Sequence, residues 1–311
     1  MVPTAQSDAE IAAANPLVSG FDQLTATAYR NRSVGASLFI SPSTPVSYDQ
    51  TVQYARSVIA KNNLAIVGSG IESGKLASLV QKHFAGVPST ASGSATTNGK
   101  TQYFGGEQRV SFAPAHHETS ARAHNGHFFL AFEGAAHGQR PELAVLRSLL
   151  GGESSVKWSS GQSPLAALSA QASGGAQASA FNLGFSDSGL FGIYVSGPHE
   201  RIGALAKSAV GSLKDLAGGS AKSEDLQRAI AKAKFEAATA LENRSLAHEN
   251  VAAQILGGGA AGVQSLDAIF GALDKVDTNA VSKAAESLLK SKSTTVVVGD
   301  VHKLPYADEA L

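Results

Sequence analysis

The chain has 311 residues, of which 43% are apolar, 6% aromatic and only 16% charged, and its 25 basic residues balance 25 acidic ones. This balance argues against the long-range field that attracts nucleic acid or an anionic membrane. The absence of cysteine excludes disulfides, thiolate catalysis and Cys-ligated zinc or iron–sulfur sites. No apolar run reaches the roughly 18 residues that span a bilayer, so we expect no direct membrane span. The balanced charge leads us to expect no nucleic-acid partner.

The N-terminal half begins with a helix–strand–helix pattern. Helical spacing of apolar residues predicts a helix over 47–62, with Ser47 as its N-cap. The apolar run Leu64–Gly68 predicts a buried strand, and helical spacing returns over 73–84. This block ends in Gly and Pro residues, which terminate regular structure.

Composition then divides the chain into parts. Residues 89–106 are dominated by Ser, Thr, Gly, Ala and Asn, as in a flexible tether. A chain of this length allows about two domains. We therefore expect a first domain in residues 1–88, a linker over 89–106 and a second domain over 107–311.

The second part predicts an α+β fold. The residues from Ala178 to Gly197 form the best-specified element, a β-hairpin with its turn at Ser186–Gly189. A new block begins at 109–113, further strands are expected at 127–132 and 294–299, and helices at 139–150, 199–217, from a Ser223 cap onward, 265–274 and 278–290. Late helices followed by one strand indicate helices packed on one face of a mixed or antiparallel sheet.

Two familiar catalytic motifs are incomplete. His248-Glu249 begins a zinc-protease pattern, but position 252, where a second imidazole is required, is Ala252. The Gly-rich stretch from Gly68 to Lys75 lacks the spacing of a phosphate-binding loop or a dinucleotide fingerprint. We interpret that stretch as a tight connection between elements.

A histidine cluster leaves two interpretations open. His116, His117 and Glu118, with His124 and His127 downstream, form the densest group of potential metal ligands. They lie in a polar segment that leads into a strand, so a solvated or partner-facing loop is favoured over a metal site. Measuring bound zinc before and after substitution of His116 and His117 distinguishes the two interpretations. Unchanged zinc content would exclude the metal site.

Other polar groups have simpler explanations. Asp187 and Ser188 suit a hairpin turn, and His199 with Glu200 suits a helix N-terminus. The Gly- and Ser-rich stretch over 151–163 could contact a substrate, but a mobile connection is favoured. The sequence therefore predicts no catalytic, cofactor-binding or metal residue and no cofactor.

Several segments also resemble a known family. They are Asp22–Arg30, Gly35–Phe39, Asn63–Phe84, Tyr103–Glu107, Ser179–Tyr194 and Leu304–Glu309. Together they resemble the core protein 2 family of the mitochondrial cytochrome bc1 complex (ubiquinol–cytochrome c reductase, complex III). That family is a non-catalytic branch of the M16 peptidases, and the resemblance covers nearly the whole chain from about residue 15.

The resemblance implies a structural subunit and not an enzyme. It implies two M16-type α+β domains on the matrix side of the inner membrane, with core protein 1 and other complex III subunits as partners. The family's N-terminal portion, where peptidase relatives carry their zinc motif, is missing from the sequence, so we expect the first domain to be truncated. Asp22–Tyr29 matches the region of the third zinc carboxylate but offers no equivalent ligand.

Two alternatives and one conflicting signal remain. The chain could be a non-catalytic α subunit of a mitochondrial processing peptidase, with the 151–163 loop handling presequence peptides. A zinc peptidase acting alone is disfavoured because the metal-activating motif is absent. The first ten residues hold two acids and no base, which by themselves favour the cytosol over a mitochondrial address.

Overall fold

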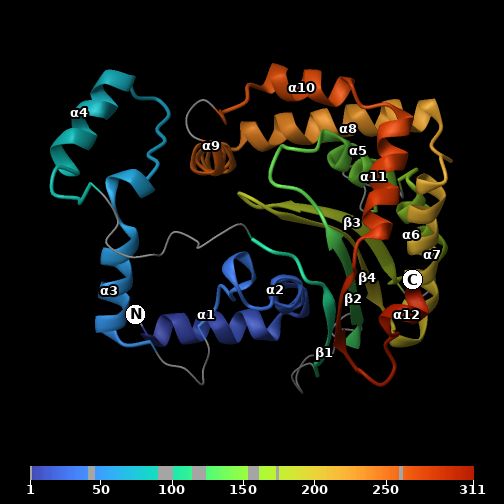
Figure 1. Cartoon of the computed structure of the whole chain (residues 1–311). Coiled ribbons are helices and arrows are strands. Elements are labelled where there is room, and N and C mark those ends of the chain that lie inside the picture. The colour runs from blue at the N-terminus through green and yellow to red at the C-terminus, as the bar shows by residue number, and fades with distance from the viewer. Residues whose placement is uncertain are drawn as a thin grey trace.

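A mixed β-sheet that carries helices on both faces forms the centre of the computed structural model (Figure 1). The structure describes residues 2–40, 46–89, 101–113, 124–152, 161–172, 175–258 and 262–311. In this part of the chain the five strands are ordered β1-β5-β2-β4-β3. They are β1 (Gly106–Ser111), β2 (Gly126–Glu133), β3 (Gln177–Gly184), β4 (Gly189–Gly197) and β5 (Thr294–Gly299).

The hairpin predicted from sequence forms one side of this sheet. Strands β3 and β4 pair antiparallel from Gln177 opposite Ser196 to Gly184 opposite Gly189. β2 joins β4 and β5 antiparallel, whereas β1 pairs with β5 in parallel. The last strand of the chain therefore lies between two earlier ones, which sequence periodicity cannot reveal.

The main hydrophobic core lies between one sheet face and a layer of helices. Alternate strand residues such as Phe128, Phe191 and Val297 point into it and are at most 1% exposed. The layer comprises α5 (Pro141–Leu150), α6 (Pro164–Gln171), α7 (His199–Ala217), α8 (Ser223–Glu242), α10 (Leu266–Asp274) and α11 (Thr278–Lys290). The predicted α+β class with a mixed sheet is confirmed, but helices lie on both faces of the sheet and not on one face as predicted.

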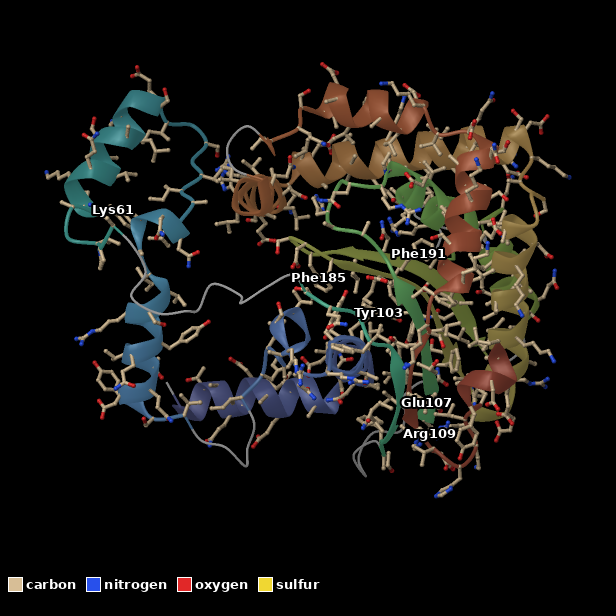
Figure 2. All side chains as sticks on the ribbon, in the orientation of Figure 1. Lys61, Tyr103, Glu107, Arg109, Phe185 and Phe191 are labelled. Carbon is tan, nitrogen blue, oxygen red and sulfur yellow. The ribbon has the colours of Figure 1, made fainter. Side chains whose placement is uncertain are left out.

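A helix from the N-terminal segment covers the other face. Helix α2 (Pro16–Tyr29), preceded by α1 (Val2–Ala14), packs Leu24 against Phe129 and the neighbouring strands. In Figure 2, Tyr103 and Phe185 lie on the α2 side of the sheet and Phe191 on the other side. Successive residues of a strand alternate between faces, so both faces of this sheet are apolar.

The described part of the N-terminal block holds two short helices. Helix α3 (Tyr48–Val58) begins at Ser47, whose side chain makes a capping box with Gln50, as predicted. Helix α4 (Ser73–His83) also follows the prediction. Neither helix contains a buried residue.

Two local predictions were wrong. Leu64–Gly68 is not a buried strand: it is irregular, with Leu64 40% exposed. A strand needs a partner, and no described strand pairs with Leu64–Gly68. Ser223 does not cap α8 but is its first residue, after an Lys222 whose side chain makes no cap hydrogen bond.

Some elements were not predicted from the sequence. They are α1, α6, α9 (Arg244–Gly258) and α12 (Ala307–Ala310), with the 3₁₀ turns η1 (Ser33–Gly35) and η2 (Lys61–Asn63). Helix α1 is polar and Ala-rich with little amphipathic pattern. In the described part of the chain no helix has both the length and the apolar character needed to cross a membrane.

The residues just before β1 connect the N-terminal segment to the sheet. The Phe104 amide donates to the Ala28 carbonyl on α2 at 2.8 Å. The Tyr103 hydroxyl lies 2.7 Å from the Lys292 carbonyl and 2.8 Å from the Thr294 hydroxyl. Within the predicted linker, residues 101–106 are thus held against the sheet.

Candidate functional site

His127 is the most buried of the predicted candidate ligands. Its Nδ1 lies 2.7 Å from the Tyr194 hydroxyl, and its Nε2 has no partner in the described part of the chain. Burial lowers the pKa of His127 to about 4, with a smaller contribution from His199. The imidazole is therefore neutral near pH 7 and acts as a packing and hydrogen-bonding group.

The other histidines make separate contacts. His199 begins α7, as predicted, and its Nε2 accepts from the backbone N–H of Asp300 at 2.9 Å. His248 lies on α9 with its Nε2 3.0 Å from the Ser69 hydroxyl. No group of three His, Cys, Asp or Glu residues able to hold a metal ion occurs among the described residues.

Part of the predicted histidine cluster cannot be placed. His116, His117 and Glu118 lie outside the described residues, so the choice between a metal site and a solvated loop stays a prediction. Residues 153–160 of the Gly- and Ser-rich loop are also outside them. The described base of this loop is attached to the sheet edge, because the Ala180 amide donates to the Gly151 carbonyl at 2.8 Å.

The hairpin turn is a structural junction. The Asp187 carboxylate accepts from the Thr101 amide at 2.8 Å, and the Tyr29 hydroxyl donates to the Gly189 carbonyl at 3.0 Å. Burial raises the pKa of Tyr29 to about 12, so its hydroxyl keeps its proton. Asp187 and Ser188 thus belong to the contact between the hairpin and the N-terminal segment, as turn residues.

The region that matches the third zinc carboxylate is also structural here. Asp22 on α2 accepts from the Ser37 hydroxyl at 2.8 Å and from the Leu38 amide at 3.3 Å. Both bonds fix the loop after α2 to the helix. A carboxylate used in this way connects two backbone segments.

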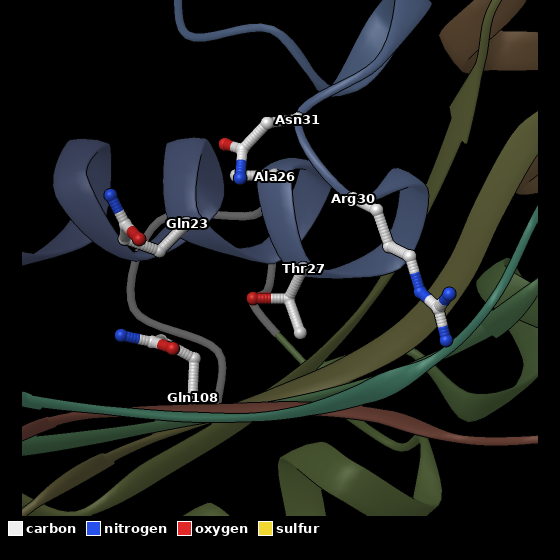
Figure 3. Close-up of a pocket in the computed structure, with 6 residues that line it drawn as sticks. All are labelled: Gln23, Ala26, Thr27, Arg30, Asn31 and Gln108. Carbon is white, nitrogen blue, oxygen red and sulfur yellow. The ribbon is translucent and has the colours of Figure 1, made fainter.

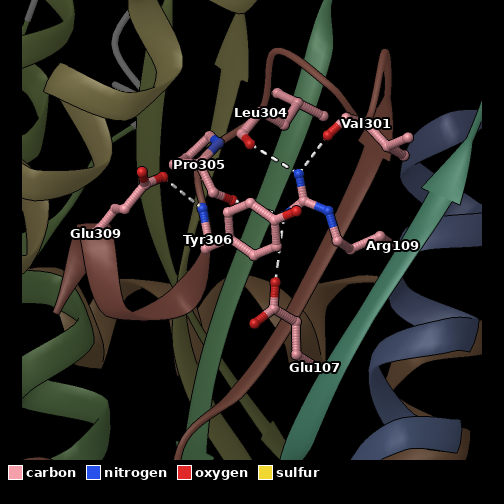
Figure 4. A network of polar contacts seen from close by, with 7 residues as sticks. All are labelled: Glu107, Arg109, Val301, Leu304, Pro305, Tyr306 and Glu309. Atoms are coloured by element: carbon pink, nitrogen blue, oxygen red, sulfur yellow. Dashed lines mark hydrogen bonds and ion pairs between the residues drawn. The ribbon is translucent and has the colours of Figure 1, made fainter.

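A polar network surrounds Arg109, a residue that no sequence motif indicates (Figure 4). Its guanidinium donates to the carbonyls of Val301, Leu304 (2.8 Å) and Pro305 (3.1 Å) and stacks on the Tyr306 ring. Arginine suits this position because its planar fork presents several donors at once. The network fixes the C-terminal segment to the start of the sheet.

A polar hollow of about 370 Å³ lies between α2 and β1 (Figure 3). Its lining residues are Gln23, Ala26, Thr27, Arg30, Asn31 and Gln108. Amides and a hydroxyl dominate this lining, and Arg30 instead stacks on Phe104 at 4.3 Å. The hollow offers hydrogen-bonding groups without an acid, base or nucleophile suited to bond-making.

The described residues 46–89 carry an apolar surface. Its exposed members include Tyr48 (75%), Tyr54 (67%), Ile59, Leu64, Ile66, Leu79 and Phe84. Exposed apolar residues gathered in one segment mark an interaction surface. We name this set the α3–α4 apolar surface.

Comparison with known proteins identifies the family of the chain. Residues 45–233, more than half of the chain, match the family described as the Peptidase M16 inactive domain. The chain belongs to the M16 peptidase family. Within it, this M16 chain is a homologue of cytochrome b-c1 complex subunit 2.

Fungal relatives support the homology over nearly the whole chain. The subunit 2 of Neurospora crassa is 37% identical over 89% of the chain, which spans 59% of that protein. The subunit 2 of Cryptococcus neoformans var. grubii is 36% identical over 99% of the chain and is covered over 67% of its own length. The chain therefore spans only about three-fifths to two-thirds of these relatives.

A solved structure shows the same fold. A chain of complex III2 from Candida albicans, solved with Inz-5 bound, superposes with a TM-score of 0.84. The match covers 99% of this M16 chain and 73% of the Candida chain at 17% sequence identity. At that identity, the likeness supports the fold alone.

Proposed function

We propose that the chain is a non-catalytic scaffold subunit of mitochondrial complex III. The similarity to cytochrome b-c1 complex subunit 2 along 99% of the chain carries this proposal. The described polar clusters support it, because they hold the chain's own segments together. The proposed partners are core protein 1 and other complex III subunits, on the matrix side of the mitochondrial inner membrane.

The domain organisation is part of the same proposal. Residues 1–88 would be the C-terminal part of a first M16-like domain, 89–106 a linker and 107–311 a second domain. Helices α3 and α4 contain no buried residue, which supports this division because they make no core of their own. Their apolar surface would then bind further polypeptide.

The proposal is tested by assembly. The tagged chain, expressed in fungal mitochondria, is expected to co-migrate with complex III on native gels and to co-purify with its other subunits. Tyr54→Asp and Leu79→Asp, both on the α3–α4 apolar surface, should reduce this recovery because a buried charge opposes association. Gln227→Asp, on an exposed position of α8, is the matched control. A stable chain absent from complex III would overturn the proposal.

A second candidate is the α subunit of a processing peptidase. The Mitochondrial-processing peptidase subunit alpha-2 of Dictyostelium discoideum is 27% identical over 92% of the chain. In this alternative the loop over 151–163 would contact presequence peptides. A photo-crosslinking presequence peptide that labels this loop specifically would favour it, and labelling no stronger than that of a scrambled peptide would exclude it.

A further inference from the structure

Helix α2 contacts the sheet through a small apolar core. The large side chains that it buries fully are Leu24 and Tyr29, which are 0% and 1% exposed. Ala28 adds one small buried side chain, and Gly20 faces Phe129 directly. The helix layer on the opposite face buries a larger apolar set. Because hydrophobic stabilisation grows with the apolar area removed from water, burial holds α2 less strongly than it holds the helix layer.

The segment before β1 is fixed on the sheet. We name residues 101–105 the strap. The Thr101 amide donates to the Asp187 carboxylate at 2.8 Å, and the Tyr103 hydroxyl lies 2.7 Å from the Lys292 carbonyl. Burial raises the pKa of Tyr103 to about 12, so this hydroxyl keeps its proton as a donor. The strap continues directly into β1, so it belongs to the framework of the sheet.

The same strap contacts the end of α2 and the turn η1. The Phe104 amide donates to the Ala28 carbonyl at 2.8 Å, and the Arg30 guanidinium lies 4.3 Å from the centre of the Phe104 ring. The Thr101 hydroxyl lies 3.0 Å from the Ser33 hydroxyl of η1, in an exposed position. Regions with few buried apolar contacts and solvent-exposed hydrogen bonds open at a lower free energy than the core. Helix α2 and η1 have both features.

We propose that residues 16–35, which form α2 and η1, are a lid on this face of the sheet, and that the strap is its catch. In the open state the lid leaves the strands while the helix layer on the opposite face stays folded. Apolar strand residues under the lid, such as Phe129 and Val296, then become accessible. The lid therefore controls access to an apolar sheet face that is buried in the closed state.

Two adjacent residues of β5 provide a matched pair of reporters. Val296 faces the lid and Val297 faces the helix layer, and both are 0% exposed. The chain has no cysteine, so Val296→Cys and Val297→Cys each introduce a single thiol. A maleimide in native buffer labels such a buried thiol only when the fold opens above it. Each rate is normalised to that of the same variant unfolded in urea.

Val296→Cys should react at least about ten-fold faster than Val297→Cys, because opening the lid needs less free energy than exposing the main core. Equal normalised rates would mean that both faces open only on global unfolding. That result would overturn the proposal.

The role of the strap is tested in the Val296→Cys protein. Arg30→Ala removes the contact with Phe104 and should speed labelling about two- to five-fold, the effect of a cation–π contact at an exposed site. Arg228→Ala is the matched control, because Arg228 is an exposed arginine of α8 on the opposite face, and it should leave the rate unchanged. An unchanged rate in Arg30→Ala, or an equal increase in Arg228→Ala, would overturn the strap as the catch of the lid.

Discussion

Gly20 on α2 faces Phe129 of the sheet, and replacing it with alanine tests that packing. A Cβ at this position would lie 2.2 Å from Cε2 and 2.3 Å from Cζ of Phe129. The Phe129 ring is fully buried and packs against Phe21 at 5.1 Å and Tyr194 at 4.8 Å, so it has little room to move. Such overpacking costs about 1–3 kcal/mol.

Gly211 is the matched control, because it lies in the middle of α7, where an added Cβ would meet nothing within 4 Å. Alanine there should stabilise the chain by about 0.5–1 kcal/mol through helix propensity. Gly20→Ala receives the same benefit and should still lower the free energy of unfolding by about 0.5–2 kcal/mol after the overpacking cost.

Urea unfolding followed by circular dichroism measures both variants, and hydrogen exchange locates the change. Amides of α2 should lose protection in Gly20→Ala, whereas those of α7 should not. If Gly20→Ala were as stabilising as Gly211→Ala, α2 would not pack against Phe129 as described.

Three further predictions concern polar groups. Arg109→Ala should lower the free energy of unfolding by about 2–3 kcal/mol, roughly 1 kcal/mol per lost carbonyl bond, and expose the amides of residues 301–311 to hydrogen exchange; unchanged exchange would contradict it. The pKa of His127 is about 4 when folded and about 6.5 when unfolded, so the unfolded chain binds more protons between these values and stability falls as pH drops from 6.5 to 4. The loss approaches about 3 kcal/mol and should be absent from His127→Gln in pH-dependent denaturation. Asp187→Ala should cost about 1–2 kcal/mol and release Thr101, measured as faster exchange of its amide, with Asp187→Asn as the milder comparison.

Much of the second part of the chain could be predicted, because its elements have strong local signals. The hairpin combines alternating apolar residues with a turn that suits Ser, Asp and Gly, and α7 and α11 have clear apolar faces. Leu64–Gly68 has a strand-like composition, but a strand also depends on a partner that local sequence does not name. Helix α1 has no amphipathic pattern, and therefore gave no signal.

The polar network was harder to predict for a related reason. Arg109 contacts carbonyls nearly 200 residues later in the chain, and carbonyl groups are present at every position. His127, by contrast, stood out by residue type, but its role depends on burial and on Tyr194. The sequence therefore identified polar candidates without showing which of them the fold brings together.

The sequence by itself determined the fold class, the absence of thiol chemistry and the failure of the zinc and phosphate motifs, because each depends on residue type and local spacing. Only the tertiary structure decided that β5 lies between β1 and β2 and that α2 covers the second sheet face. These features depend on contacts between residues far apart in the chain. Burial and hydrogen bonding across such distances are set by the whole fold, which no single segment encodes.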